Sequence, residues 1–336
     1  MSELNRIALK IISNGKGILA ADESNATMTK RLEAVGLTSS PESRLSFRET
    51  LFSSNCMREC IGGVILYDET INQMTSLGKS IPDLINSSGA ETGIKVDTGA
   101  KELANSSTEK ITEGLDGLRD RLKKYYKLGA RFTKWRAVYI ISDLNPTSLA
   151  ISSNAHALAR YSSLVQESGM VPIVEPEILM DGDHTADVCF SKTSDVIQKC
   201  FEELILHKVD LSGIILKPNM ILAGNKSKKK ISSGEVSEKT LKCLKSSVPS
   251  EVPGIAFLSG GQSEIEATEN LNLINKNNNT KFVITYSYGR ALQQEALKFW
   301  SKNKNDIEGT QKIFNHRAKM CSLSAQGKWA SKLENK

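Results

Sequence analysis

Several features that would place the chain outside the cytoplasm are missing from its sequence. Residues 1–17 contain no apolar run long enough for a secretion signal or a membrane span, because Asn5, Arg6 and Lys10 interrupt the hydrophobic residues. The six cysteines are scattered, with no C-x-x-C pair and no histidine at metal-ligand spacing. This pattern argues against a disulfide framework and against a zinc site. We therefore expect a cytoplasmic protein with reduced thiols, no bound metal and no membrane contact.

No Pro-, Gly- or Ser-rich linker divides the 336 residues, and no internal repeat is visible. The composition, 39% hydrophobic and 24% charged, is that of a globular chain that can bury a core. One α/β barrel commonly needs ~250 residues plus insertions. We therefore expect a single domain over 1–336, with the barrel at about 15–300 and a C-terminal helix and tail at about 301–336.

The net charge of +6 does not by itself choose between nucleic acid, anionic lipid and a phosphorylated small molecule as the partner. The densest basic run, Lys226-Ser-Lys-Lys-Lys230, has no interleaved aromatic residues and lies between a strand candidate and a helix candidate. We interpret it as a solvated loop, so nucleic acid is not an expected partner. The alternative, a scaffold that holds a polyanion or a filament on its basic surface, stays open.

Eight short apolar runs rich in β-branched residues are the strand candidates. They are GILAAD (17–22), GGVILYDE (62–69), GIKVD (93–97), FTKWRAV (132–138), VPIVEPE (171–177), GIILK (213–217), GIAFLS (254–259) and FVITYS (282–287). Segments with helical spacing of apolar residues lie between them, at 41–58, 115–128, 152–167, 193–207, 234–245, 264–273 and 291–301.

The alternation of strand and helix is typical of parallel βα units. Eight such units predict an α/β fold of one closed (β/α)8 TIM barrel, and an open doubly wound sheet is the alternative. The helical spacing of the first residues predicts an N-terminal helix, and residues 306–332 predict a C-terminal helix followed by a polar tail.

Charged and hydroxyl side chains stand where these strand candidates end. They are Asp22, Lys95, Asp97, Lys134, Arg136, Glu175, Glu177, Lys217, Ser259 and Ser287. Active groups of a closed parallel barrel collect at this end of the strands. Residues two apart on a strand face the same side, so the pairs 95/97, 134/136 and 175/177 each share a face. Any one pair could merely neutralise itself inside the barrel, but a whole ring of charges indicates a site.

Lys217 ends an apolar strand, Ile214-Ile215-Leu216, and is followed by Pro218. Desolvation there disfavours the ammonium form, and a second cation such as Lys134 would act in the same direction. A neutral amine is a nucleophile for carbonyl groups. The sequence therefore predicts a carbonyl-binding lysine, and the alternative is a lysine that extends to the rim of the barrel.

Two glycine-bearing turns have the composition of phosphate sites. Ser259-Gly260-Gly261-Gln262 follows the seventh strand candidate and Ser287-Tyr288-Gly289-Arg290 follows the eighth. Glycines let backbone N–H groups approach an anion, and the following helix presents its positive end. Barrels frequently bind phosphate with these two loops, so we expect a phosphorylated substrate.

Seven blocks of the sequence together resemble the class I fructose-1,6-bisphosphate aldolases. They are GKGILAADES (15–24), GIKVD (93–97), KWR (134–136), VPIVEPEIL (171–179), LKPNM (216–220), FLSGGQS (257–263) and SYGRAL (287–292), in the order of that family. The resemblance covers roughly residues 1 to 330. It implies a lyase of glycolysis and gluconeogenesis that cleaves fructose 1,6-bisphosphate reversibly.

The resemblance also implies the roles of the catalytic residues. Lys217 would form a Schiff base with the C2 ketone, and Glu175 would serve as acid and base in its formation. Lys134 would assist that chemistry, and Asp22 would take the proton from the C4 hydroxyl. Arg136 and Glu177 would hold these groups in place. No metal or other cofactor is implied, because the protonated imine withdraws electrons as a divalent ion otherwise would.

Two groups of residues are implied to hold the phosphates. Ser259, Gly260, Gly261, Ser287, Gly289 and Arg290 would hold the C1 phosphate, and Ser24, Thr27, Arg31, Arg44 and Lys95 would hold the other end. Many family members carry Ser where this chain has Thr27.

The end of the chain departs from the well-known eukaryotic members. Their tail ends in a tyrosine that helps to protonate the enamine, whereas this sequence ends in Lys-Leu-Glu-Asn-Lys. Our hypothesis is that water or another residue protonates the enamine.

The resemblance further implies a homotetramer. The nearest rival function is another Schiff-base barrel enzyme, such as a transaldolase or an aldolase for a keto-acid sugar, and the two phosphate sites argue against it.

Overall fold

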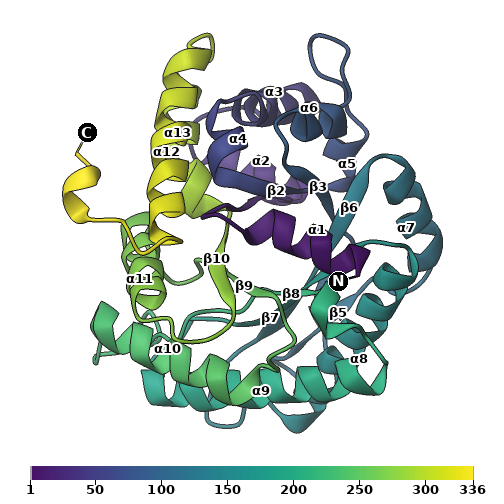
Figure 1. Ribbon diagram of the computed structural model, residues 1–336, viewed down its shortest axis with the longest axis vertical. Helices are drawn as coiled ribbons and strands as arrows, with labels where there is room; N and C mark the ends of the chain where they lie inside the picture. The colour runs from purple at the N-terminus through teal and green to yellow at the C-terminus, as the bar shows by residue number, and fades with distance from the viewer. Residues whose placement is uncertain (1, 336) are drawn as a thin grey trace.

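Eight parallel strands close into a barrel in the computed structural model, which describes residues 2–335 (Figure 1). The barrel strands are β1 (Gly17–Ala21), β2 (Ile61–Leu66), β3 (Glu91–Lys95), β6 (Ala130–Tyr139), β7 (Val171–Ile178), β8 (Ile215–Leu216), β9 (Gly254–Phe257) and β10 (Val283–Tyr288). Each overlaps one of the eight runs predicted from the sequence. The (β/α)8 TIM barrel is confirmed, and the alternative of an open sheet is wrong because β1 pairs with both β10 and β2.

Helices surround the barrel on its outside (Figure 1). They are α2 (Asn25–Glu33), α3 (Pro41–Phe52), α4 (Cys56–Cys60), α5 (Asp68–Ile71), α6 (Ile81–Ser87), α7 (Leu118–Lys127), α8 (Ser148–Glu167), α9 (Ala186–Leu206), α10 (Ser233–Ser247), α11 (Glu264–Lys276), α12 (Arg290–Lys302) and α13 (Ile307–Ser324). The helix predicted over 41–58 is two helices, α3 and α4. The Ser53 hydroxyl donates to the Glu49 carbonyl at 2.8 Å, and this bond accompanies the end of α3.

Three helices and a hairpin were not predicted from the sequence. The helices α2, α5 and α6 are short, and the residues of α2 are mostly polar, so they give little periodic signal. The antiparallel pair β4 (Gly99–Glu102) and β5 (Lys110–Glu113) lies between β3 and β6 in the chain and forms a separate two-stranded sheet. Its strands are largely exposed, so they lack the apolar run that marks a barrel strand.

The N-terminal helix α1 (Glu3–Ile12) lies across one opening of the barrel (Figure 1). Its apolar face, with Ile7 and Ile11, packs against barrel-lining side chains such as Phe132 and Ile215. The approach is close, because a Cβ on Gly62 would lie 1.9 Å from the carbonyl oxygen of Ile11. Helix α1 therefore fills the amino-terminal end of the barrel, and the carboxyl ends of the strands stay free.

The C-terminal segment after α13, which we predicted as a polar tail, is anchored to the rest of the fold. Helix α13 ends at Ser324, and a 3-10 turn follows at Ser331–Leu333. The Trp329 side chain is buried and donates through Nε1 to Glu334 at 2.7 Å. Arg317 of α13 holds the same carboxylate with both terminal nitrogens. The Trp329 backbone N–H also donates to Oδ1 of Asn272 in α11 at 3.0 Å, so the segment is held against α11 and α13.

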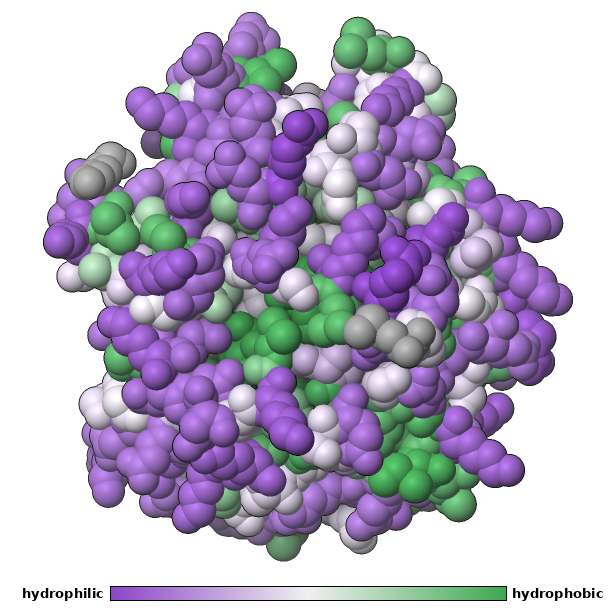
Figure 2. Space-filling view, in the orientation of Figure 1, coloured by the Kyte–Doolittle hydropathy of each residue, from purple (hydrophilic) through white to green (hydrophobic). Residues whose placement is uncertain are grey.

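The face seen in Figure 1 is mostly polar, and apolar side chains gather near its middle beside α1 (Figure 2). No helix within residues 2–335 combines the length and the hydropathy that crossing a bilayer requires.

Besides the apolar core that α1 shares with the inside of the barrel, a larger apolar core lies between the outside of the barrel and the helices. It includes Trp135, Phe257 and Trp300.

Helix α1 should contribute measurably to stability through Ile11, which is fully buried. Ile11→Ala removes buried methyl groups and leaves a cavity. The backbone of Ile11 already lies against Gly62, so α1 cannot move inward to fill that cavity. We therefore expect a loss of roughly 2–5 kcal/mol in the free energy of unfolding. The matched control is Ile205→Ala on α9, where the side chain is 59% exposed. Urea unfolding followed by tryptophan fluorescence compares the two, and equal losses would contradict this role for α1.

Candidate active site

A cavity of about 770 Å³ opens at the carboxyl ends of the barrel strands. It is lined by most of the side chains that the sequence singled out: Asp22, Ser24, Thr27, Arg31, Lys95, Asp97, Lys134, Arg136, Glu175, Glu177, Lys217, Ser259, Gly260, Ser287, Gly289 and Arg290. These residues come from every barrel strand except β2, or from the loop or helix that follows the strand. The barrel thus collects residues that are far apart in the sequence.

The register of the strands sets the heights of the charged groups. Lys95 of β3 pairs with Lys134 of β6, and Arg136 of β6 pairs with Glu175 of β7. On the next strand, the Lys217 N–H donates to the Val174 carbonyl at 2.8 Å, which continues the ladder past β8. Because side chains alternate along each strand, all these groups face the inside of the barrel.

Two lysines and two carboxylates form an alternating cluster at the bottom of the cavity. The Lys217 Nζ lies 2.8 Å from Oε1 of Glu175, and the Lys134 Nζ lies 3.4 Å from Oε2 of the same carboxylate. Lys134 also contacts Oδ2 of Asp22 at 2.8 Å. Lys217, Glu175 and Lys134 are each at most 4% exposed. Charges buried this deeply persist only when they are paired, so the four groups form one electrostatic unit.

The lysines hold both carboxylates in their ionised form. Burial by itself raises the pKa of Glu175, but the ammonium groups of Lys217 and Lys134 outweigh burial and lower it. For Asp22 burial again acts upward, and Lys134 and then Lys217 bring the pKa down to about 2. Burial acts against the charged form of Lys134, but Asp22 and Glu175 outweigh burial and raise its pKa. Each carboxylate can therefore accept a proton at neutral pH.

The sequence suggested that Lys134 would act on Lys217 as a second cation. In the structure Glu175 lies between the two amines and contacts both, so a carboxylate is the nearest charge to Lys217. The expectation of a neutral amine at Lys217 rested on burial and on this second cation and did not include the carboxylate, and it stays a prediction.

A second set of ion pairs lies beside the cluster. Arg136 donates through Nε to Oε2 of Glu177. Burial by itself lowers the pKa of Arg136, but the Glu177 carboxylate outweighs burial and raises it. Lys95 donates to both the side chain and the backbone carbonyl of Asp97. Asp97 in turn accepts from the backbone N–H of Arg136 at 3.3 Å. These bonds tie the ends of β3, β6 and β7 together around the cavity.

One side of the cavity is suited to an anion. The hydroxyl of Ser287 is buried, and it has no hydrogen-bond partner within residues 2–335. Helix α12 starts at Arg290 directly after Gly289, which offers no side-chain cap, whereas the first turn of α11 is capped by Ser263. The N–H groups at the start of α12 are thus left for a ligand, and an uncapped helix start favours a phosphate.

A second region suited to an anion is formed by Ser24 and α2, which follow β1, the strand next to β10. Ser24 caps this helix by accepting from the Thr27 N–H at 3.3 Å, and the two hydroxyls lie 3.1 Å apart. Arg31 donates through Nη1 to Glu23, and its Nε and Nη2 are buried without a hydrogen-bond partner among the residues that the structure describes. A buried guanidinium with two free donors is a further anion site.

Two residues implied by the resemblance do not line the cavity. Arg44 is buried and holds Glu69, with Nε 2.8 Å from Oε2 and Nη2 2.5 Å from Oε1, so its charge is already neutralised. Gly261 has a φ of +77°, and a Cβ there would lie 2.5 Å from the Cβ of Met180. Its place in the fold is the turn that brings Gly260 to the cavity.

The cavity also includes residues that sequence reasoning missed. Glu23, Lys30, Tyr67, Thr98 and Gln294 line it. Lys30 lies one residue before Arg31 in α2, and Gln294 lies one turn after Arg290 in α12, so a prediction of where these two helices begin would have identified both. Tyr67 follows β2 directly, and Thr98 lies three residues after the end of β3, so our rule for strand ends applies to Tyr67 and nearly reaches Thr98.

A barrel with a buried lysine next to a carboxylate, between two anion sites, is typical of enzymes that form imines with phosphorylated carbonyl compounds. The model of one protein family, described as fructose-bisphosphate aldolase class-I, matches residues 3–336. The chain belongs to the class-I fructose-bisphosphate aldolase family.

Individual relatives agree with the family match. The chain is 49% identical over 329 residues to the non-muscle type fructose-bisphosphate aldolase of Lethenteron camtschaticum, covering 97% of this chain and 90% of that protein. It is 46% identical over 326 residues to the cytosolic fructose-bisphosphate aldolase 4 of Arabidopsis thaliana, covering 97% and 83%. A solved structure of the Plasmodium falciparum aldolase, in complex with TRAP and a small-molecule inhibitor, has a TM-score of 0.96 at 42% identity and covers 98% of this chain and 95% of that one.

The pairing of Asp22 should be visible in acid stability. Its pKa is lowered from 3.8 to about 2, so its contribution is complete above about pH 4 and is lost as the pH falls toward 2. In Lys134→Met the strongest neighbouring cation is gone and the pKa of Asp22 rises, so stability should begin to fall at a higher pH. Thermal unfolding between pH 3 and 6 measures this.

The control for this prediction is Lys298→Met, which breaks an exposed ion pair with Glu295. Exposed pairs contribute little to stability, so this variant should follow the wild type. A Lys134→Met protein with the same acid profile as the wild type would show that Lys134 does not set the ionisation of Asp22.

Proposed function

We propose that the chain cleaves fructose 1,6-bisphosphate reversibly into dihydroxyacetone phosphate and glyceraldehyde 3-phosphate through a Schiff base on Lys217. The observation that carries this proposal is the contact of 2.8 Å between the buried Lys217 amine and Glu175, at the bottom of a cavity that holds two candidate anion sites. A nucleophile within hydrogen-bond reach of a base is the arrangement that covalent catalysis needs.

The first step forms the imine. The ionised Glu175 takes a proton from the Lys217 ammonium, and the free amine attacks the C2 ketone to give a carbinolamine. Glu175 then returns its proton to the departing hydroxyl, which leaves as water while the C2–N double bond forms. Lys134, at 3.4 Å from Glu175, stabilises the carboxylate each time it is ionised.

The second step breaks the bond between C3 and C4. The Asp22 carboxylate, ionised because its pKa is about 2, accepts the proton of the C4 hydroxyl. The electron pair of the C3–C4 bond moves into the iminium, which becomes an enamine, and glyceraldehyde 3-phosphate leaves. The positive iminium supplies the electron withdrawal, so no metal ion and no cofactor takes part.

The last step protonates the enamine at C3 and hydrolyses the imine to release dihydroxyacetone phosphate. Water or another residue of the cavity provides the proton. Arg136 and Glu177, which are paired, orient the groups around Glu175.

The phosphates occupy two groups of residues that line the cavity. Ser259, Gly260, Ser287, Gly289 and Arg290 hold the C1 phosphate, and Ser24, Thr27, Arg31 and Lys95 hold the C6 phosphate. The Ser287 hydroxyl and the Nε and Nη2 of Arg31 support this assignment, because they are buried without a hydrogen-bond partner among residues 2–335 and both side chains line the cavity, where a phosphate would complete them. Two phosphate sites disfavour a transaldolase or a keto-acid aldolase.

The chain acts as one catalytic domain in the cytoplasm, as the cytosolic relative supports, and assembles as a homotetramer. The alternative of a polyanion or filament scaffold has less support, since Lys230 of the basic run donates to backbone carbonyls of its own loop at 2.8 and 3.3 Å.

Borohydride trapping tests the covalent step. Reduction in the presence of dihydroxyacetone phosphate should place a single adduct on Lys217, located by mass spectrometry, and activity should persist in EDTA. Lys217→Ala should lose the adduct and at least about 1,000-fold in kcat, because the nucleophile is gone. The control is Lys127→Ala, which replaces an exposed lysine on α7 and should keep both the adduct on Lys217 and the activity. An adduct at another lysine would overturn the mechanism.

Arg290 tests the assignment of the C1 phosphate. A hydrogen bond to a charged group contributes about 1.5–3 kcal/mol, so Arg290→Ala should raise KM for fructose 1,6-bisphosphate by about 10- to 100-fold. Cleavage of fructose 6-phosphate, which has no C1 phosphate, should be affected much less. Steady-state kinetics with both substrates measures this. The control is Arg119→Ala, which removes an exposed ion pair with Glu167. Equal losses on the two substrates would contradict the assignment, and a wild type that prefers fructose 6-phosphate would overturn the substrate class.

A further inference from the structure

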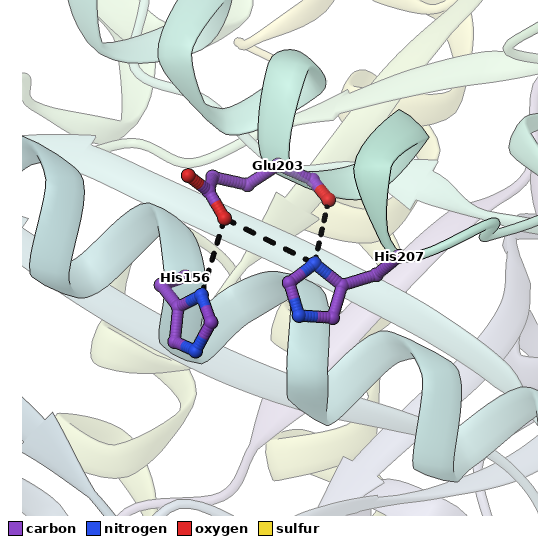
Figure 3. A group of neighbouring side chains, drawn as sticks. All are labelled: His156, Glu203 and His207. Atoms are coloured by element: carbon purple, nitrogen blue, oxygen red, sulfur yellow. Dashed lines mark hydrogen bonds and ion pairs between the residues drawn. The ribbon is translucent and has the colours of Figure 1, made fainter.

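Two histidines and a glutamate form a cluster on the outer helices, apart from the residues that line the cavity. His156 belongs to α8, Glu203 to α9, and His207 follows the last residue of α9 (Figure 3). Glu203 and His207 lie on the same face of α9 because they are four residues apart. His156 is 47 residues from Glu203 in the sequence, so the expectation of no histidine at metal-ligand spacing did not include this group.

The distances between the donor atoms fit a coordinated metal ion. Nδ1 of His156 lies 3.2 Å from Oε2 of Glu203, and Nδ1 of His207 lies 3.9 Å from the same oxygen. One ligand atom from each of the three residues lies within 4.8 Å of the others. Tetrahedral ligands with bonds of about 2.0 Å lie ~3.3 Å apart. Small side-chain rotations therefore suffice to close the group on one ion.

The surrounding hydrogen bonds allow this change. Nδ1 of His207 now lies 2.9 Å from the Glu203 carbonyl, to which it can donate only as N–H. That carbonyl also accepts the His207 backbone N–H at 3.0 Å, so it keeps a partner if the ring turns to a metal. Lys199 contacts the other carboxylate oxygen, Oε1, at 3.4 Å and leaves Oε2 to the imidazoles. Its charge opposes a bound cation, and its second contact with Glu202 at 3.2 Å reduces that effect.

We propose that His156, Glu203 and His207 bind one divalent transition-metal ion of the Zn²⁺ class, with water completing its coordination. Imidazole nitrogens suit Zn²⁺, whereas Mg²⁺ and Ca²⁺ prefer oxygen ligands. The His156 side chain is 52% exposed, so an ion can reach the group from solvent. The ion would join α8 to α9, the helices that follow β6 and β7, and so would brace the strands that carry Lys134 and Glu175.

Other donors in the chain are poor competitors for this ion. All six cysteines are buried. Among residues 2–335, no other group of three His, Cys, Asp or Glu side chains brings its ligand atoms together in this way. His316 contacts Glu334 at 3.5 Å. That contact is a histidine–glutamate pair without a second histidine, which makes it a matched control.

Isothermal titration of the full-length, chelator-treated protein with Zn²⁺ tests the proposal. The wild type should bind one Zn²⁺ per chain and should not bind Mg²⁺ at the same concentrations. His156→Ala, His207→Ala and Glu203→Gln should each weaken Zn²⁺ binding at least about 10-fold, since each removes a ligand. His316→Ala should bind as the wild type does. Zn²⁺ should also raise the Tm of the wild type and not that of His156→Ala.

Circular dichroism before each titration shows that a variant is folded, and His156→Gln replaces His156→Ala if the alanine variant is not. The proposal is overturned if the His156→Ala/His207→Ala double variant binds Zn²⁺ as tightly as the wild type, or if His316→Ala loses as much affinity as His156→Ala. Because the readout is binding and not aldol cleavage, neither result depends on the proposed catalytic role of Lys217.

Discussion

The structure depends on one electrostatic constraint. Four charged side chains inside the barrel must neutralise one another, each by contact with the next. Asp22, Lys134, Glu175 and Lys217 alternate in sign, and each contacts its neighbour within 3.4 Å. Removing any member leaves an uncompensated charge in a region of low dielectric, which costs several kcal/mol. The strand register, the floor of the barrel and the surrounding ion pairs all hold these four groups in contact.

This constraint explains how two carboxylates on one barrel take different parts. Asp22 sits at the end of the series and contacts one lysine, and its pKa is about 2. Glu175 lies in the middle and contacts two lysines through different oxygens. In the proposed mechanism, Glu175 can therefore exchange a proton with either amine, and Asp22 is the base for the C4 hydroxyl. The two carboxyl side chains differ by one methylene, so we attribute their different proposed roles to their positions in the network.

The sequence was sufficient for the barrel and for most of the charged site, and the reason is the regularity of the βα unit. Apolar runs identified all eight barrel strands, and the rule that polar groups follow strand ends located Lys134, Glu175 and Lys217. It was insufficient where side chains compete for partners. Nothing in the sequence shows that Arg44 pairs with Glu69, or that Gly261 is needed for a turn against Met180. Nor does it show that His156 meets His207, since contacts between helices follow from packing and not from periodicity.

The position of helix α1 determines the path by which ligands reach the site. Because its side chains fill the amino-terminal end, residues 2–335 leave the barrel open to solvent at the carboxyl ends of the strands, and a small molecule reaches Lys217 from that end. In the mechanism proposed above, the aldehyde would leave through this opening while the other triose is still attached to Lys217. A polymeric substrate that had to thread through the cylinder is excluded for the same reason, which limits this site to compact molecules.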